Sequence, residues 1–254
     1  MAGTGRFAWH DLMTTDVEAA KRFYSDLFGW TYELWQPETM DYPMITAGDR
    51  RWGGMMARPT EAEWPPHWLG YVSVADVDAT TEKVKSAGGR VFHEPTAIPG
   101  AGRYSIVADP QGAVFALHTS EGGGEMGGDG EVPVGGFCWD EVMTSDVEGA
   151  LAFYRAVIGW EDSPRPMGVG GGTYHVLQSG GVDRAGLMAM PPGVPAPPYW
   201  STYVLVEDAD ATRARTLELG GKAYTEVMAA PGVGRFATLA DPQGAVFGVL
   251  QPEG

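Results

Sequence analysis

Two stretches of the chain place a tryptophan and a carboxylate where they can act together. The first reads FAWHDLMTTD near the N-terminus, and the second reads FCWDEVMTSD in the other half of the chain. Because side chains alternate along a strand, Trp9 and Asp11 share one face, as do Trp139 and Glu141. Such a carboxylate can pair with a cation or act as a general base. Asp11 and Glu141 are therefore the catalytic candidates.

These stretches belong to a duplication. Residues 7–30 and 137–160 are identical at 12 of 24 positions, with an offset of 137 − 7 = 130. The motif ADPQGAVF begins at 108 and again at 240, an offset of 240 − 108 = 132. The repeat predicts two similar domains, residues 1–120 and 137–254. A glycine-rich acidic linker at 121–136 is expected to join them.

Each copy contains two rounds of a strand, a helix and further short strands. The first helix of each copy follows a capping-box pattern, Thr15-x-x-Glu18 or Ser145-x-x-Glu148. The second helices are expected to begin near Asp76 and Asp208, and the DPQG motif is typical of a turn before the last strand. The pattern predicts an α+β fold with mostly antiparallel sheets.

Composition restricts the partners. Acidic residues outnumber basic ones 33 to 17 and the formal charge is −16, which disfavours nucleic acid and anionic membrane surfaces. Cys138 is the single cysteine, so the chain can form no internal disulfide. No apolar run approaches the ~18 residues that span a bilayer. We expect a cytoplasmic protein, monomer or homodimer, with no membrane or nucleic-acid partner.

The order of strand, TTDVEAAKRFYSDLFGW, strands, VSVADVDATTEKVKSAGG, strands and DPQGAVFALH resembles the vicinal oxygen chelate superfamily of glyoxalase I, extradiol dioxygenases and bleomycin-resistance proteins. It is similar in particular to the two-domain actinobacterial type labelled glyoxalase-like or hydroxylase. The resemblance implies four βαβββ modules that form two cup-shaped sheets. The first module can pair with the second and the third with the fourth, or the first with the fourth and the second with the third.

The resemblance also implies where a metal would be held. Its ligands would stand seven residues before the helix-capping aspartate and seven after the aspartate of the DPxG turn. The first count gives Trp9 and Trp139, and the second gives Ala116 and Gly248. The two further positions fall near Met55 or Met56 and Leu69 in copy one, and near Leu187 or Met188 and Ser201 in copy two. None of these side chains suits a hard or borderline cation, so no metal and no cofactor is expected.

The histidines supply no ligand set that both copies share. Between the copies His10 matches Asp140, His67 matches Tyr199, His93 matches Thr225 and His118 matches Leu250, while His175 has no counterpart. His10 has the opposite parity to Trp9 and is expected to point toward the helices. A metal bound by Asp11 and His118 remains an alternative.

If the family's ligand positions line each cup, apolar and aromatic side chains surround each carboxylate. Such a lining suits a flat organic ligand, so the first hypothesis is a protein that binds a small aromatic or planar molecule. The second is an isomerase, lyase or hydroxylase with Asp11 or Glu141 as general base, and the third is an interface for self-association or another protein. The expected ligand-binding residues are Trp9, Met13, Met55, Leu69, Tyr71, Ala116 and His118 in copy one, and Trp139, Met143, Met188, Ser201, Tyr203 and Gly248 in copy two.

Two matching arginines have two interpretations. Arg103 and Arg235 occupy equivalent places in PGAGR and PGVGR. Each can clamp an anionic group of a substrate. Alternatively, each ties its loop to the backbone or to the aspartate of the following turn.

Overall fold

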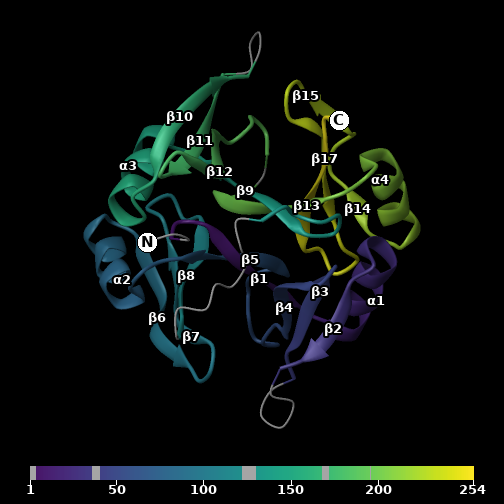
Figure 1. Cartoon of the computed structure of the whole chain (residues 1–254), viewed down its shortest axis with the longest axis horizontal. Coiled ribbons are helices and arrows are strands. Elements are labelled where there is room, and N and C mark those ends of the chain that lie inside the picture. The colour runs from purple at the N-terminus through teal and green to yellow at the C-terminus, as the bar shows by residue number, and fades with distance from the viewer. Residues whose placement is uncertain (1–3, 36–40, 122–129, 168–171, 195) are drawn as a thin grey trace. The chain divides into compact units, whose positions relative to one another are not determined.

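The order of one strand, one helix and further strands occurs four times in the structure, a computed structural model that describes residues 4–35, 41–121, 130–167, 172–194 and 196–254 (Figure 1). The expected α+β class is therefore confirmed. The first two modules consist of β1 Phe7–Thr14, α1 Val17–Phe28, β2 Thr31–Leu34, β3 Pro43–Ala47 and β4 Arg50–Ala57, then β5 His67–Ser73, α2 Val77–Ser86, β6 Arg90–Ile98, β7 Gly102–Ala108 and β8 Val114–Ser120.

The third and fourth modules repeat this order. None of the helices in the described ranges is long and apolar enough to cross a bilayer. These modules consist of β9 Phe137–Thr144, α3 Val147–Val157, β10 Glu161–Pro166, β11 Thr173–Ser179 and β12 Val182–Ala189, then β13 Tyr199–Leu205, α4 Ala209–Glu218, β14 Lys222–Ala223, β15 Met228–Ala230, β16 Gly234–Ala240 and β17 Val246–Pro252.

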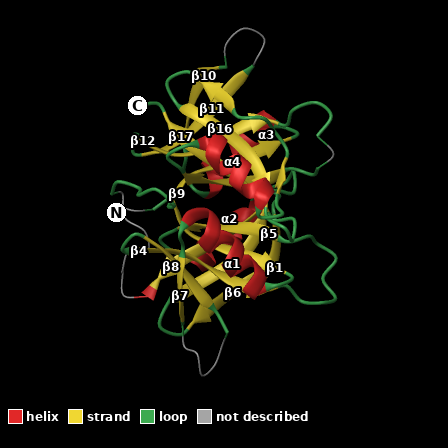
Figure 2. Ribbon diagram, turned by 90° about the vertical axis from the view of Figure 1, so that its right-hand side faces the viewer, coloured by secondary structure: helices red, strands yellow, loops and turns green. Residues whose placement is uncertain are grey.

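The strands form two sheets, drawn in yellow in Figure 2. The order is β2-β3-β4-β1-β5-β8-β7-β6 in one sheet and β10-β11-β12-β9-β13-β17-β16-β14 in the other, with β15 beside β16. Within each module the first and last strands are parallel and the other pairs are antiparallel. The two modules of each copy thus share a sheet.

The hydrophobic cores combine the modules differently. Unit 1 contains residues 1–8, 70–128 and 139–200, and unit 2 contains residues 9–69, 129–138 and 201–254. Helices α2 and α3 pack together in unit 1, and α1 and α4 pack together in unit 2. Both pairings allowed by the sequence therefore occur. The sheets join the first module with the second and the third with the fourth, whereas the cores join the first with the fourth and the second with the third.

The domain boundaries at 120 and 137 stay a prediction. Residues 122–129 of the expected linker lie outside the described residues. Its last residues are hydrogen-bonded within unit 2, where Gly135 donates its N–H to the Leu205 carbonyl and accepts the indole N–H of Trp30 at 2.7 Å.

A tyrosine of α1 stands at the centre of the core of unit 2. Tyr24 is fully buried among aromatic rings, with centroid distances of 5.1 Å to Trp30, 5.5 Å to Trp68 and 5.7 Å to Phe247. Its hydroxyl donates to Asp241 Oδ2 at 3.2 Å and accepts from Trp68 Nε1 at 3.1 Å. Asp241 Oδ1 accepts three backbone N–H groups of the DPQG turn. We call this arrangement the tyrosine hub.

Unit 1 has the same hub. The Tyr154 hydroxyl donates to Asp109 Oδ2 at 2.9 Å and accepts from Trp200 Nε1 at 3.0 Å. Asp109 Oδ1 accepts the N–H groups of Gly112 and Ala113, each at 2.8 Å. In both units, each oxygen of the buried aspartate carboxylate thus accepts at least one hydrogen bond. A buried carboxylate needs such bonds to replace those that water would make.

The helix starts differ from the expected capping boxes by one residue. The N-cap of α1 is Asp16, whose side chain accepts the N–H of Ala19, and the N-cap of α3 is Asp146. Thr15 and Ser145 were therefore wrong as caps, because the aspartate carboxylate is the group that accepts the N–H of the third helical residue, Ala19 or Gly149. Asp76 and Asp208 cap α2 and α4 as expected.

Replacing Tyr24 with phenylalanine should lower the free energy of unfolding by about 1–3 kcal/mol. The change leaves Trp68 Nε1 and Asp241 Oδ2 without the hydroxyl that joins them in a buried position. Urea unfolding measures the loss, and Tyr224→Phe is the control because Tyr224 is 59% exposed. Equal stability of the two variants would contradict the role of the hub.

The same variant should reveal a dependence on alkaline pH. Burial and then the Asp241 carboxylate raise the pKa of Tyr24 well above 10.0. The folded chain therefore keeps a proton that the unfolded chain releases, so the stability contributed by Tyr24 falls as the pH rises above 10.0. The stability advantage of the wild type over Tyr24→Phe should shrink by up to about 1.4 kcal/mol per pH unit in that range. An advantage that is constant with pH would argue against the raised pKa.

Candidate functional site

A tryptophan, a carboxylate and a tyrosine are hydrogen-bonded to one another in unit 2. Trp9 and Asp11 lie two residues apart on β1 and point to the same face. Trp9 Nε1 donates to Asp11 Oδ1 at 3.0 Å and to the Tyr42 hydroxyl at 2.7 Å. The Tyr42 hydroxyl in turn donates to Asp11 Oδ1 at 2.6 Å. We call these three residues the Trp9 cluster.

A glycine lets the tyrosine reach the carboxylate. Gly54 on β4 lies directly opposite Asp11 in the parallel pair with β1. A Cβ atom at Gly54 would stand 2.2 Å from the Tyr42 hydroxyl oxygen, well inside contact distance. Any larger residue at this position would therefore push Tyr42 away from Asp11.

Unit 1 contains a matching arrangement, the Trp139 cluster, formed by Trp139, Glu141 and Tyr174. Trp139 Nε1 donates to the Tyr174 hydroxyl at 2.7 Å. Gly186 lies opposite Glu141, and a Cβ atom there would stand 1.8 Å from the Tyr174 hydroxyl. The cluster is thus repeated with glutamate in place of aspartate.

Burial keeps these tyrosines protonated. Burial and then the Asp11 carboxylate raise the pKa of Tyr42 well above 10.0. Burial and the Glu141 carboxylate raise the pKa of Tyr174 and of Tyr199 in the same way. The hydroxyl of Tyr42 therefore acts as a donor, and its 2.6 Å bond has the length of a charge-assisted hydrogen bond.

The clusters combine a fixed ring with a buried acid. Asp11 and Glu141 are 4% and 7% exposed, whereas the side chains of Trp9 and Trp139 remain half-buried. The hydrogen bonds of each indole N–H hold the plane of its ring. In the Trp9 cluster the carboxylate lies at the N–H edge of the indole ring.

One expected lining residue lies on the other face of its sheet. Met55 is opposite Leu12, is fully buried and belongs to the hydrophobic core of unit 2. Met56 instead lies opposite Met13, which shares the face of Asp11. The expected position is corrected from Met55 to Met56, because a shift of one residue along a strand reverses the face.

The other expected residues of unit 2 alternate with core residues. Leu69 follows Trp68 of the core on β5 and is 2% exposed. On β13, Ser201 and Tyr203 are buried and precede Val204 of the core. The ring of Tyr203 lies against Gly248 on β17, where a Cβ atom would be 2.2 Å from the ring.

In unit 1 the expected residues also face away from the helices. Tyr71 lies opposite Ala116, and His118 follows two positions later on β8. They alternate along their strands with Val72 and Leu117, which belong to the core of unit 1. The remaining expected residues, Met143 and Met188, lie opposite each other, and the Tyr199 hydroxyl contacts Met143 Sδ at 3.1 Å.

Two histidines have clear structural surroundings. His10 is 3% exposed and stacks on Phe137 with ring centroids 4.1 Å apart, so it packs on the core side as its parity predicts. His175 lies on β11, and its Nδ1 is 2.9 Å from Asp162 Oδ1.

Sequence reasoning missed Tyr42 and Tyr174. A signal was present, since 174 − 42 = 132 is the offset of the repeated DPQG motif. Both tyrosines lie close to the start of a matching strand, β3 or β11. Their pairing with Asp11 and Glu141 depends on contacts between strands, which the offset does not reveal.

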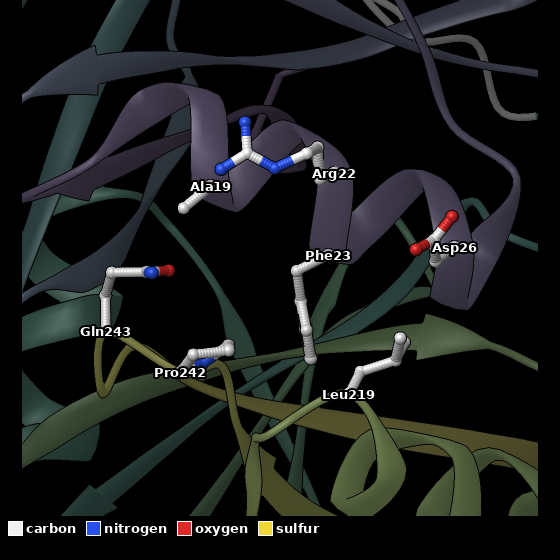
Figure 3. Close-up of a pocket in the computed structure, with 7 residues that line it drawn as sticks. All are labelled: Ala19, Arg22, Phe23, Asp26, Leu219, Pro242 and Gln243. Carbon is white, nitrogen blue, oxygen red and sulfur yellow. The ribbon is translucent and has the colours of Figure 1, made fainter.

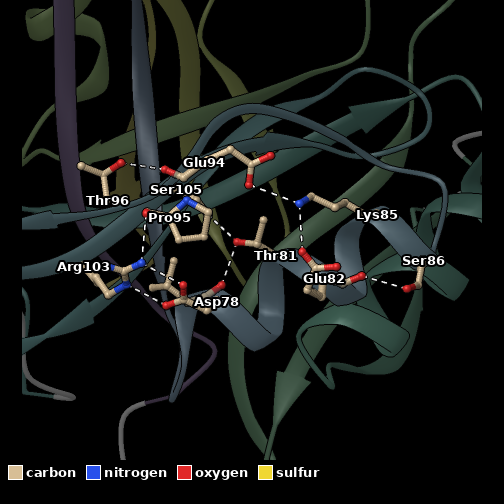
Figure 4. A network of polar contacts seen from close by, with 11 residues as sticks. Asp78, Thr81, Glu82, Lys85, Ser86, Glu94, Pro95, Thr96, Arg103 and Ser105 are labelled. Carbon is tan, nitrogen blue, oxygen red and sulfur yellow. Dashed lines mark hydrogen bonds and ion pairs between the residues drawn. The ribbon is translucent and has the colours of Figure 1, made fainter.

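The two matching arginines bind helix aspartates. Arg103 makes a two-pronged ion pair with Asp78 in the first turn of α2, at 2.7 and 2.8 Å, and also donates to the Pro95 carbonyl (Figure 4). Arg235 pairs with Asp210 in the first turn of α4. The partner differs from the expected turn aspartate, and the geometry favours the structural interpretation over an anion clamp.

A surface pocket of about 280 Å³ opens beside α1 in unit 2 (Figure 3). It shares no residue with the Trp9 cluster. Its lining is Ala19, Arg22, Phe23, Asp26, Leu219, Pro242 and Gln243.

The positions that the resemblance assigns to metal ligands include Trp9, Trp139, Ala116 and Gly248. The indole N–H of Trp9 is a donor only, and Ala116 and Gly248 have no donor atom to offer a metal. Within the described ranges, no group of three or more His, Cys, Asp or Glu side chains is arranged to hold a metal ion.

Two relatives match nearly the whole chain. A protein of Mycobacterium tuberculosis named "Putative glyoxylase CFP32" is 40% identical over 250 residues, which cover 96% of this chain and 94% of the relative. The anthracycline biosynthesis protein DnrV of Streptomyces peucetius is 32% identical over 264 residues, which cover 97% and 93%.

Family models and solved structures agree with this relationship. The Mn(II)-bound glyoxalase of Novosphingobium aromaticivorans superposes with a TM-score of 0.66 at 17% identity, covering 99% of this chain and 83% of that one, which shows a shared fold. Residues 137–250 match the glyoxalase-like domain. Residues 6–117 match the model of the glyoxalase/bleomycin resistance protein/dioxygenase superfamily, and the chain belongs to that superfamily.

Proposed function

We propose that the chain binds a small planar aromatic molecule against the Trp9 cluster, and that the Trp139 cluster offers a second surface of the same kind. The observation that carries the proposal is the fixed orientation of Trp9. Its N–H is held by Tyr42 and Asp11 while the side chain stays half-buried. A ring that is already immobilised loses little conformational entropy when a ligand stacks on it.

The buried carboxylate adds selectivity to this surface. Asp11 accepts hydrogen bonds from Trp9 and Tyr42, and such bonds favour the ionised form of a carboxylate. A buried negative charge favours ligands whose aromatic system carries a positive charge or polarised N–H or O–H groups. We therefore expect cationic or donor-bearing planar rings to bind more tightly than neutral hydrocarbons.

The relatives support a planar ligand. One relative is named as an anthracycline biosynthesis protein, and anthracyclines are planar aromatic compounds. The side chains at the positions of the family's metal ligands do not fit a metal, so the proposed binding uses none there. Indole, hydroxyl and carboxylate groups of this chain supply the contacts.

A second candidate function is catalysis. Hydrogen bonds from Tyr42 and Trp9 hold the Asp11 carboxylate in a fixed position, from which it can accept a proton from a bound ligand. An isomerase or lyase would use Asp11, or Glu141 in the other cluster, as general base. Incubation of the bound ligand followed by mass spectrometry tests this, since a chemically unchanged ligand would leave only the binding function.

Calorimetric titration with planar compounds tests the proposal. We expect stoichiometric binding of the planar cation proflavine, and a loss of about tenfold in affinity for Trp9→Ala, because stacking on one ring contributes about 0.5–1.5 kcal/mol. Trp64→Ala is the matched control, since Trp64 is 40% exposed and lies outside the cluster. Trp139→Ala reports the second surface. Binding that is unaffected by both Trp9→Ala and Trp139→Ala would exclude the proposed site.

The glycine beside the cluster offers a test of its geometry. Gly54→Ala should destabilise the protein by about 1–3 kcal/mol and weaken ligand binding, because the new Cβ displaces the Tyr42 ring from Asp11. Tyr42→Ala in the same chain should relieve part of the destabilisation, and a double-mutant cycle measures this coupling. Gly130→Ala is the control, since no atom lies within 4 Å of a Cβ there. An additive cycle would contradict the contact.

A further inference from the structure

The surface pocket beside α1 contains one side chain of each charge. It lies within unit 2 and is lined by α1, by the residue that follows the last turn of α4, and by the DPQG turn (Figure 3). Its charged residues are Arg22 and Asp26, and both are exposed. Because α1 and α4 pack on the core of unit 2, the pocket lies away from the face that carries the Trp9 cluster.

The two charges of the pocket are not paired with each other. Arg22 and Asp26 are four residues apart on α1, a spacing at which opposite charges can form an ion pair. Neither side chain makes an ion pair or a hydrogen bond with any residue that the structure describes, whereas the neighbouring Lys21 pairs with Glu18 at 2.8 Å. Helical side chains lean toward the N-terminus of their helix, and the Arg22 guanidinium extends over Ala19, away from Asp26 (Figure 3). Both charges are therefore free to bind a ligand.

An apolar floor separates the two charges. The ring of Phe23 lies between them and is 4% exposed, and Leu219 lies on the side of Asp26 (Figure 3). Leu219 is also the C-cap of α4, and the carbonyl end of a helix carries partial negative charge. The Gln243 amide lies on the side of Arg22, where it can donate a further hydrogen bond. The pocket is thus positive at one end, apolar in the middle and negative at the other end.

The other copy shows that packing does not require these charged residues. Ala152 and Ala156 stand on α3 at the positions that match Arg22 and Asp26. The phenylalanine and the DPQG turn, by contrast, are present in both copies. Residues that serve the core are therefore shared, while the two charges of the pocket belong to unit 2 alone.

The distance between the charges restricts the ligand. Four residues of a helix span about 6 Å along its axis, and the guanidinium leans still further from Asp26. A ligand that pairs with both ends must therefore hold its own carboxylate and ammonium group well apart, which excludes an α-amino acid. Since a water molecule occupies about 30 Å³ of liquid, the volume of about 280 Å³ holds about nine groups of that size. The ligand is thus a short chain with a charge at each end.

We propose that the pocket binds an ω-amino carboxylate, a small molecule in which an apolar chain separates a carboxylate from an ammonium group. The carboxylate pairs with Arg22, the chain lies on Phe23, and the ammonium group pairs with Asp26. The ligand thus contacts both modules that form unit 2. The site is independent of the proposed function, because it shares no residue with either tryptophan cluster.

Nuclear magnetic resonance titrations of the full chain with two isomers test the charge spacing. 6-Aminohexanoate and norleucine have the same composition, but norleucine carries both charges on one carbon atom. The wild type should bind 6-aminohexanoate with a dissociation constant of about 1 mM, as expected for a ligand of this size. Norleucine should bind about fivefold more weakly, because it reaches only one of the two charges. Equal affinities, or no binding of 6-aminohexanoate, would overturn the proposal.

The second copy supplies the substitutions that assign each charge. Arg22→Ala and Asp26→Ala introduce the residue that α3 carries at the matching position, and each should weaken 6-aminohexanoate binding about fivefold. Arg22→Ala should leave hexylamine binding unchanged, and Asp26→Ala should leave hexanoate binding unchanged, because each compound lacks the group that the lost side chain binds. Arg155→Ala, at an exposed arginine of α3, is the control. Unchanged 6-aminohexanoate binding in either pocket variant would contradict the site.

Chemical shifts locate the ligand without any variant. 6-Aminohexanoate should shift the side-chain amide resonances of Gln243 and leave the indole N–H resonances of Trp9 and Trp139 unchanged. Its affinity should fall as salt is added, because salt screens exposed charges. Shifts at either indole in place of Gln243, or an affinity that is independent of salt, would overturn the proposal.

Discussion

A tyrosine hydroxyl bonded to a buried aspartate is the interaction on which both units depend. In the DPQG turn, the aspartate uses one oxygen to bind the N–H groups of its own turn. The other oxygen, out of water, needs a donor that the turn cannot supply. Tyr24 provides it for Asp241 from 217 residues away, and Tyr154 provides it for Asp109. Each core is therefore completed only when two modules meet.

This requirement explains why sheets and cores divide the chain differently. Strands of consecutive modules join into one sheet through their backbones. The helix of the first module, however, finds its aspartate in the fourth, and the helix of the third module finds its own in the second. Each strand turns its core residues toward the helices, so its alternate residues lie on the opposite face. The Trp9 and Trp139 clusters occupy that opposite face.

The two copies share their hubs but differ in polar groups elsewhere. Aspartate in the Trp9 cluster is replaced by glutamate in the Trp139 cluster, and His118 is replaced by Leu250. Beside α1, Arg22 and Asp26 line the pocket of unit 2, whereas alanines stand at the matching positions of α3. Both hubs are needed for the packing of their units, while residues on the open faces are free to differ. The duplication therefore gives two similar backbones that carry different polar side chains.

The sequence by itself determined the features that depend on neighbouring residues. Strand alternation placed Trp9 and Asp11 on one face and His10 on the other, and the repeat predicted two similar domains. Capping patterns located the helices to within a residue, although the carboxylate of Asp16, rather than Thr15, makes the cap. These features follow from the period of a strand or a helix, which a local pattern records.

Only the tertiary structure decided which distant residues meet. Tyr42 reaches Asp11 across 31 positions, because Gly54 lies opposite that carboxylate in the β1–β4 register. The same register places Met56, and not Met55, on the face that carries the Trp9 cluster. A register is selected by the packing of a whole core, in which one residue of slip would bury the wrong face. No local pattern contains that choice, so the Trp9 cluster became visible only in the folded chain.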